Sequence, residues 1–431
     1  MVRLASIEFT KLKNVRDGTR LTFPEAGAVL LGKNGTGKTT LLQYIVALCT
    51  ANPSAFISDE PFDVSATFSF AAGARTRLRL QGEPTSVAAM PIKDSPQVAR
   101  YLSPSESIKL EYYIILSSQQ ENYRIAVSDN RAELYRNDQS LCTPFPIDLS
   151  QSQLASCVWR LANLVDQPEM HSLVSELADL GDMLCRYDDG LDYFHILTDE
   201  HSSYVSFDII VSDESSETPS KADDRRFVQR IPAGLATALM RGPNVNLETE
   251  YLFAKYSHVE FLNTFVELSN FSGATIVIPI DARRATDYGI LYKFRTLKFS
   301  FELGSERISH TKLSFGQKRL LSYLYYLECN TEIGVADELV NGMHHEWIEH
   351  CLVTACENRQ MFYTSQNPLL LDFLEFESEP EISERFVTCK WNDQDGFVWE
   401  NLDPRIGQEF YRLYKAGLQH VSDILRTKGW W

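Results

Sequence analysis

The stretch Gly32-Lys33-Asn34-Gly35-Thr36-Gly37-Lys38-Thr39 matches the pattern G-x-x-x-x-G-K-[ST] at every position. The apolar run 28–31 precedes it as a buried strand would, and residues 40–48 follow with apolar side chains at helical spacing. In this context glycines let backbone N–H groups point at phosphate oxygens, and the helix N-terminus adds its positive dipole end. A glycine-rich turn that matches by chance is the alternative, and both flanks argue against it. The stretch predicts a nucleoside-triphosphate site.

Two side chains of this loop, called the P-loop below, have distinct expected roles. Lys38 should reach the β- and γ-phosphates, and the Thr39 hydroxyl should bind Mg²⁺. The residues expected to bind the nucleotide here are Gly32, Lys33, Asn34, Gly35, Thr36, Gly37, Lys38, Thr39 and Thr40.

The composition is that of a globular protein large enough for more than one lobe. The chain has 431 residues, of which 44% are hydrophobic and 23% charged. No apolar run reaches membrane-spanning length, and residues 1–8 lack the layout of a signal peptide. We therefore expect a cytoplasmic protein without a membrane partner. Its eight cysteines are scattered, with no C-x-x-C pair, and are expected to be reduced core residues.

The charge balance is acidic. Asp and Glu number 58 against 41 Lys and Arg, which gives a formal net charge of −17. This is the opposite of the broad basic footprint of many nucleic-acid-binding proteins. A local basic patch could still bind DNA, so nucleic acid is a partner that the charge does not indicate and does not exclude.

Periodicity predicts strands and helices in a mixed order. Alternating apolar residues predict strands at residues 63–70, 76–80, 112–116 and 123–127. Helical spacing predicts helices at residues 154–165, 247–271, 316–327 and 408–426. Residues 212–226 are acidic and rich in serine, and we expect them to form a mobile loop.

Three further motifs follow later in the chain. Leu313-Ser314-Phe315-Gly316-Gln317 opens a predicted helix, and Asp337-Glu338 ends a short apolar strand. Thr364-Ser365-Gln366-Asn367-Pro368-Leu369-Leu370-Leu371-Asp372 follows another apolar strand. Each motif is weak alone, because paired acids are usually a solvated strand end or a structural ion pair.

In this order, the motifs resemble those of ABC-type ATPases, and of the RecF/SMC/OLD-like branch in particular. Residues 313–317 resemble the family's signature loop L-S-G-G-Q, with Phe315 in place of the first glycine. Asp337-Glu338 resembles the Walker B end, and the run on to His344 resembles the branch's D-E-x-x-x-G-L-H. Residues 364–372 look like its T-T-H-S-P-x-L-L-D, with Gln366 in place of a histidine.

The resemblance implies an α/β fold, an ABC/RecF-like P-loop ATPase head with a mixed β-sheet. A helical plus β insertion would lie between the P-loop and the signature loop (residues 313–317). We expect an N-terminal ATPase lobe with an antiparallel β subdomain at residues 1–150 and a mainly helical insertion at residues 151–272. Residues 273–431 would form the C-terminal ATPase lobe.

The same resemblance implies a composite site for ATP and Mg²⁺. The signature loop of a second subunit, facing head to tail, would complete the site, so we expect a dimer or higher oligomer. From that loop, Ser314, Gly316 and Gln317 are expected to bind the nucleotide. Asp337 would hold Mg²⁺ together with Thr39, and Glu338 would orient and deprotonate the attacking water.

Gln366 is expected to act beside Glu338 and to slow turnover. The family's histidine can carry a positive charge, whereas a glutamine amide donates a neutral hydrogen bond. Charge-assisted hydrogen bonds are about twice as strong as neutral ones, so the transition state should lose stabilisation. Alternatively, Gln366 only caps the turn before Pro368.

The rest of the chain guides the choice among the family's functions. No sustained heptad predicts an SMC-like coiled coil, and the long separation of Lys38 from Ser314 argues against a transporter subunit. About sixty residues follow Pro368, fewer than the nuclease domain of OLD proteins needs. The three histidines of the following segment are interpreted as turn and helix surface, not as an H-N-H nuclease site, and are His344, His345 and His350.

The resulting hypothesis is an ATPase that assembles through composite sites and controls a separate effector. That effector would be a nuclease or toxin, as in antiphage defence systems of the Septu or PARIS type. The alternative is a RecF/SMC-like DNA-repair ATPase that binds DNA as an ATP-bound dimer.

Overall fold

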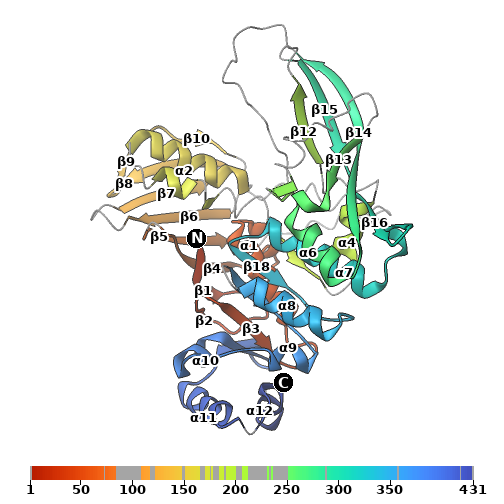
Figure 1. Ribbon diagram of the computed structural model, residues 1–431. Helices are drawn as coiled ribbons and strands as arrows, with labels where there is room; N and C mark the ends of the chain where they lie inside the picture. The colour runs from red at the N-terminus through yellow and green to blue at the C-terminus, as the bar shows by residue number, and fades with distance from the viewer. Residues whose placement is uncertain are drawn as a thin grey trace. The chain divides into compact units, whose positions relative to one another are not determined.

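The computed structural model describes most of the chain, and the chain divides into two compact units (Figure 1). The described residues are 2–71, 73–83, 108–116, 122–147, 151–165, 170–174, 176–177, 184–188, 191–199, 206–211, 231–232, 234–235, 251–286, 289–356, 359–417 and 419–429. The predicted acidic loop at 212–226 lies outside them.

The two units are not consecutive segments of sequence. Unit 1 comprises Met1–Arg186, Glu332–Glu338 and Ala355–Trp431, and unit 2 comprises Tyr187–Thr331 and Leu339–Thr354. The boundaries of these units differ from those of the expected segments 1–150, 151–272 and 273–431. The expected division therefore stays a prediction about sequence segments.

Unit 1 contains an antiparallel sheet of nine strands in the order β10-β8-β7-β6-β5-β4-β1-β2, with β9 paired to β8. Its strands are β1 (Arg3–Lys11), β2 (Thr19–Thr22), β4 (Phe62–Ser69), β5 (Arg75–Gly82), β6 (Ile108–Ile115), β7 (Asn122–Ser128), β8 (Arg131–Arg136), β9 (Gln139–Ser140) and β10 (Phe145–Pro146). Buried and exposed residues alternate along β5 and β7, as expected for strands with one face on the core. The four strands predicted from alternation in this region are confirmed.

A second sheet of six strands has the order β11-β18-β19-β3-β20-β21. Its strands are β3 (Gly27–Leu31), β11 (Arg186–Tyr187), β18 (Ile333–Ala336), β19 (Gln360–Tyr363), β20 (Phe386–Asn392) and β21 (Gly396–Asn401). The pairs β18–β19, β19–β3 and β3–β20 are parallel, and β20–β21 is antiparallel. All residues of β3, β18 and β19 are buried, which is typical of parallel strands covered on both faces.

Helices of unit 1 complete this architecture, which confirms the predicted α/β class and mixed β-sheet. The predicted helical plus β insertion between the P-loop and the signature loop stays a prediction. They are α1 (Lys38–Cys49), α2 (Gln151–Val165), α9 (Pro368–Asp372), α10 (Glu379–Arg385), α11 (Pro404–Lys415) and α12 (Val421–Thr427). Helix α1 contributes Leu41, Leu42 and Ile45 to one buried cluster that also contains residues of both sheets. This packing fixes the helix, and with it the loop that precedes it, on the six-stranded sheet.

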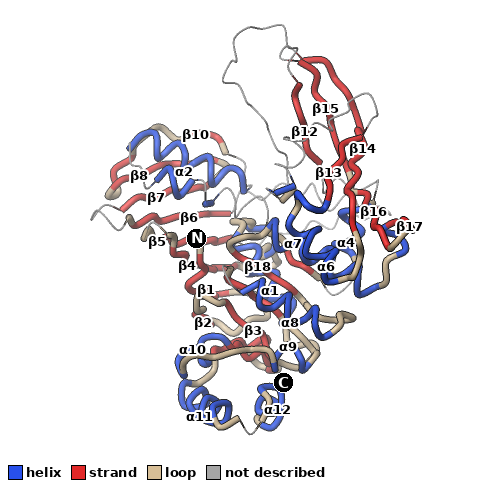
Figure 2. Tube along the Cα trace, viewed as in Figure 1, coloured by secondary structure: helices blue, strands red, loops and turns tan. Residues whose placement is uncertain are grey.

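The C-terminal region differs from the single closing helix predicted at 408–426. Figure 2 shows α11 and α12 as separate helices near α10. Helix α11 begins earlier, at Pro404, because Asp403 caps it by accepting a hydrogen bond from Arg405 N (2.8 Å). It ends before Gly417, whose φ of 64° is a left-handed conformation that terminates helices.

The described residues of unit 2 contain another antiparallel sheet and several helices. The strand order is β12-β15-β14-β16-β17, with β13 paired to β14. The strands are β12 (Ser206–Val211), β13 (Tyr251–Lys255), β14 (Gly273–Thr286), β15 (Gly289–Arg295), β16 (Lys298–Leu303) and β17 (Glu306–Ser309). The helices are α4 (Asp192–Thr198), α6 (Glu260–Leu268), α7 (Phe315–Cys329) and α8 (His345–Cys356), the last two residues of α8 belonging to unit 1.

The helix predicted over 247–271 is only partly correct. Its second half contains α6, but Tyr251–Lys255 forms β13. A short apolar run suits either structure, and pairing with β14, far away in sequence, decides for the strand. The helix predicted at 316–327 is confirmed by α7.

Candidate nucleotide site

The P-loop connects β3 to α1 at the carboxyl edge of the parallel sheet. Strand β3 lies between β19 and β20 and is parallel to both. The loops that follow β18 and β19 leave the same edge, because these strands run in the same direction. The sheet therefore brings Asp337-Glu338 and the segment from Thr364 next to the P-loop, all within unit 1.

At two positions of the loop only glycine fits, because neighbouring atoms lie too close to the loop backbone to leave room for a Cβ. A Cβ on Gly32 would lie 2.3 Å from the Cys389 carbonyl oxygen, and one on Gly37 would lie 2.6 Å from the Phe397 ring. Gly37 has a φ of 81° and stands at the N-terminus of α1. Its left-handed conformation is inexpensive only for glycine. Strands β20 and β21 thus support the loop from one side and fix its path.

Lys38 folds back over the loop. Its Nζ donates hydrogen bonds to the carbonyls of Gly32 (2.8 Å) and Lys33 (3.1 Å). Thr36 Oγ1 also donates to the Lys33 carbonyl (2.8 Å). The ammonium group is held over the backbone that the sequence predicts to cradle phosphate, where a positive charge would meet the phosphate oxygens.

Asp337 accepts three hydrogen bonds. Its Oδ2 accepts from Thr39 Oγ1 (2.7 Å) and from an Arg186 guanidinium nitrogen (2.8 Å). Its Oδ1 accepts from Thr364 Oγ1 (2.6 Å). The hydroxyl and carboxylate that the sequence predicts as Mg²⁺ ligands are therefore adjacent. Hard oxygen donors of this kind suit Mg²⁺, and a nucleotide phosphate and water would supply the other ligands.

Glu338 lies beside Asp337 with 8% of its surface exposed. Its backbone has a φ of 48°, which is uncommon for a residue other than glycine, asparagine or aspartate. The Glu338 N–H donates to Thr364 Oγ1 (2.8 Å). Thr364 therefore bonds to both acidic residues and fixes their orientation.

Gln366 is the partner of the Glu338 carboxylate. The Gln366 N–H donates to Oε2 (2.9 Å), and its Nε2 donates to Oε1 (3.0 Å). The same Nε2 lies 3.4 Å from Asn34 Oδ1 in the P-loop. The turn before Pro368 is capped by Asn367, which accepts from Leu369 N (3.0 Å), so capping does not account for the Gln366 side chain.

The signature loop belongs to unit 2 and is described separately. Ser314 is the N-cap of α7, with its Oγ accepting from Gln317 N (3.2 Å), and Gln317 Oε1 accepts from Ser314 N (3.0 Å). This reciprocal pair is a capping box. A Cβ on Gly316 would lie 2.6 Å from the Gly342 carbonyl. The side chains of Ser314 and Gln317, predicted to bind nucleotide, thus bond to the helix terminus.

Phe315 stands where the resemblance noted from the sequence leads us to expect glycine, and its ring packs on the turn that contains Gly342. A Cβ on Gly342, whose φ is 74°, would lie 2.6 Å from that ring. The Phe315 side chain still has 49% of its surface exposed. A large apolar group therefore stands at the tip of the helix, beside the capping box.

Sequence reasoning missed Arg186 as a site residue, and it quoted Thr364 only as part of a motif. Arg186 lies in a strand of two residues, 151 positions from its partner Asp337. No local pattern could have identified it. Thr364 could have been recognised, because a hydroxyl at a parallel strand end, next to an acidic pair, faces that pair.

The described residues contain no group of three or more His, Cys, Asp or Glu side chains placed to hold a metal ion. The rings of His344 and His345 contact each other, with centroids 4.6 Å apart. None of the seven cysteines whose side chains are described is in a disulfide, and burial raises the pKa of Cys389 to about 12. None of the helices searched among the described residues is long and apolar enough to cross a membrane.

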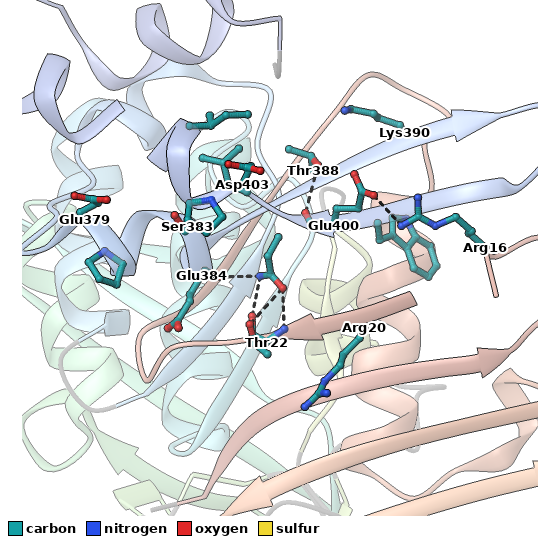
Figure 3. A pocket seen from close by; sticks show the side chains of 16 residues that line it. Arg16, Arg20, Thr22, Glu379, Ser383, Glu384, Thr388, Lys390, Glu400 and Asp403 are labelled. Carbon is teal, nitrogen blue, oxygen red and sulfur yellow. Dashed lines mark hydrogen bonds and ion pairs between the residues drawn. The ribbon is translucent and has the colours of Figure 1, made fainter. Parts of the chain in front are cut away.

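Figure 3 shows a different pocket of unit 1, with a volume of about 720 Å³. Its charged residues are of both signs, and Arg16 donates to Glu400 (2.8 Å) inside it. Asn401 donates to the Thr22 carbonyl (2.8 Å). The residues that line this pocket include none of the predicted site residues, and one of them, Trp399, donates a hydrogen bond to the Thr36 carbonyl of the P-loop (3.4 Å).

Comparison with known proteins identifies no family. No protein-family model and no curated protein matches the chain. Among solved structures, it is similar to an SMC head bound to the C-winged helix domain of ScpA, at 11% identity over 94% of this chain and 99% of that chain, with a TM-score of 0.41. It is also similar to the SMC head domain from Thermotoga maritima, at 11% identity over 93% and 99%, with a TM-score of 0.35. Both scores are low, and the function proposed below depends on the geometry of the site.

Proposed function

We propose that this chain is a slow ATPase of the ABC/RecF-like type that binds ATP with Mg²⁺. The observation that supports this best is the bonded set of Thr39, Asp337, Thr364, Glu338 and Gln366 on adjacent ends of parallel strands. This set supports the proposal because its members, the proposed metal ligands Thr39 and Asp337, the proposed base Glu338 and the amide of Gln366, are bonded beside the P-loop.

In this mechanism the P-loop N–H groups and Lys38 bind the phosphates, and Thr39 with Asp337 holds Mg²⁺. The metal, when bound, neutralises charge on the β- and γ-phosphate oxygens. Glu338 accepts a proton from water while the water oxygen bonds to the γ-phosphorus. The bond from that phosphorus to the bridging oxygen breaks, and ADP and phosphate leave. Gln366 holds the Glu338 carboxylate in position.

Two variants of the full chain test this proposal. Lys38→Ala removes the charge on the phosphates, so ATP affinity measured by calorimetry should fall by about 100-fold or more. Glu338→Gln should keep ATP affinity within a few-fold and reduce hydrolysis by about 100-fold or more. Lys109→Ala, which removes an exposed lysine of β6, is the matched control. Tight ATP binding by Lys38→Ala would refute the assignment.

We further propose that ATP-bound copies associate head to tail, with Ser314 and Gly316 of one copy at the phosphates of the other. The exposed N-terminus of α7 supports this, because a helix N-terminus favours an anion. The resulting assembly would control a separately encoded nuclease or toxin in antiphage defence. The net charge of −17 makes a basic partner favourable.

Co-purification with the products of neighbouring genes tests the effector. Capture of a nuclease or toxin whose activity changes with ATP would support it. The alternative, a DNA-repair ATPase, predicts instead that Glu338→Gln protein with ATP binds duplex DNA, which fluorescence anisotropy measures. DNA binding without any captured partner would favour the alternative.

A further inference from the structure

Asp337 shares one carboxylate oxygen between the predicted metal-binding hydroxyl and a cation. Oδ2 accepts from Thr39 and from Arg186, while Oδ1 is bonded to Thr364. The Arg186–Asp337 ion pair is mostly shielded from water, with side-chain exposures of 27% and 11%. Shielding strengthens the attraction between the two charges. Arg186 thus bonds to the same carboxylate oxygen as Thr39, the other proposed metal ligand.

A divalent cation and a guanidinium group compete for such an oxygen. Mg²⁺ bound between Thr39 and Asp337, directly or through its water, would stand next to a fixed positive charge and be repelled by it. The two cations also need the same lone pairs of Oδ2. Binding of Mg²⁺ should therefore weaken or break the hydrogen bond from Arg186 to Asp337. Conversely, that hydrogen bond should raise the Mg²⁺ concentration at which the site is half-saturated.

The residue after Arg186 is anchored in unit 2. Tyr187 is 1% exposed, its hydroxyl donates to the Arg319 carbonyl (3.0 Å), and it lies 3.1 Å from Ser322 Oγ. Arg319 and Ser322 belong to α7, the helix that begins at the signature loop. Successive side chains of a strand point to opposite sides. The two residues of β11 thus engage Asp337 in one unit and α7 in the other.

We propose that Arg186 is a cation gate of the nucleotide site, a positioning residue that competes with Mg²⁺ for Asp337. When Mg²⁺ binds with the nucleotide, Arg186 leaves Oδ2, and the peptide link to Tyr187 transmits the change to α7. The inference rests on the proposed function both for the nucleotide and for the metal position at Thr39 and Asp337.

Two measurements on the full chain test the gate. Mn²⁺ alone is titrated by electron paramagnetic resonance, and binding of fluorescent ATP is followed against free Mg²⁺. Arg186→Gln should lower the concentration of either metal at half-saturation by about tenfold. Arg186→Lys, which keeps the charge, should stay closer to wild type, and nucleotide affinity in EDTA should not change in either variant.

The opposite sign overturns the proposal. If Arg186 only orients Asp337, Arg186→Gln should raise the metal concentration at half-saturation. An unchanged concentration at half-saturation would also contradict the competition. Wild-type protein that binds Mn²⁺ but no ATP would contradict the proposed function and leave the metal competition measurable. Circular dichroism checks that each variant is folded, and Arg186→Met, which also removes the charge and the hydrogen-bond donors, takes the place of Arg186→Gln if that variant does not fold.

Hydrogen exchange tests the connection to α7. Mg²⁺ with ATP should change the exchange of amides 315–329 in the wild type, and Tyr187→Phe, which removes only the hydroxyl, should reduce that change by at least half. No change in the wild type, or the same change in Tyr187→Phe, would contradict transmission through β11.

Discussion

The P-loop and the signature loop differ in what their side chains bond to. Around the P-loop, residues from three strand ends are bonded to one another across about three hundred positions of sequence, as in the pair of Thr39 and Asp337. In the signature loop, Ser314 and Gln317 bond to each other within one helical turn. The first region has the organisation of a site assembled by its own chain, and the second that of a terminus available to another molecule.

The strongest test of this difference changes the signature loop. Ser314→Arg places a bulky cation at the N-terminus of α7 and removes the N-cap, which costs about 1 kcal/mol of stability. We expect ATP affinity within a few-fold of wild type, but loss of ATP-dependent association and about 100-fold slower hydrolysis. Light scattering with and without ATP, and a phosphate-release assay, measure both.

Ser314→Ala is the control for that variant, because it removes the same cap without adding bulk or charge. Because it also removes the hydroxyl that is proposed to contact phosphate, it should weaken ATP-dependent association, but less than Ser314→Arg does. A Ser314→Arg protein that assembles and hydrolyses ATP like the wild type would show that the signature loop does not act across an interface.

Substitutions of two P-loop glycines test whether contacts with β21 hold the loop in place. Gly35 and Gly37 both have a φ of 81°, but a Cβ on Gly35 meets no atom within 4 Å, whereas one on Gly37 meets Phe397. Each substitution to alanine should lower the free energy of unfolding by about 1 kcal/mol, because alanine is strained in the left-handed conformation. Gly37→Ala should lose a further 1–3 kcal/mol or so from the clash, as measured by urea denaturation.

Phe397→Leu provides the reciprocal variant. Added to Gly37→Ala, it should recover part of the lost stability by making room for the methyl group. Equal stability of Gly35→Ala and Gly37→Ala would mean that β21 does not hold the loop in solution.

The smallest expected effect is that of Gln366→His. A protonated imidazole can donate a charge-assisted hydrogen bond where the amide donates a neutral one, so single-turnover hydrolysis should become several-fold faster. The gain should be larger at pH 6 than at pH 8, because the imidazole loses its charge as pH rises through about 6.5. A rate equal to wild type at both pH values would remove Gln366 from the chemistry.

Local features of the sequence predicted much of this structure. The P-loop, the acidic pair and the helix α7 each depend on residues within one short segment, and the strands that precede the P-loop and the acidic pair are apolar throughout. The strand at Tyr251–Lys255, the contact of Arg186 with Asp337 and the division into interleaved units depend on partners far away in sequence. No periodicity records such pairings, which is why they could not be predicted.

At position 338, the residue types that would favour stability differ from the one that the proposed hydrolysis needs. A glutamate with a φ of 48° costs about 1 kcal/mol relative to a relaxed backbone, whereas glycine or asparagine adopts that conformation more readily. Glu338→Asn would therefore be tolerated, or even favoured, in a selection for thermal resistance, although it shortens the side chain that is expected to take the proton. A melting-temperature screen of this protein would retain inactive variants at the position where the proposed chemistry takes place.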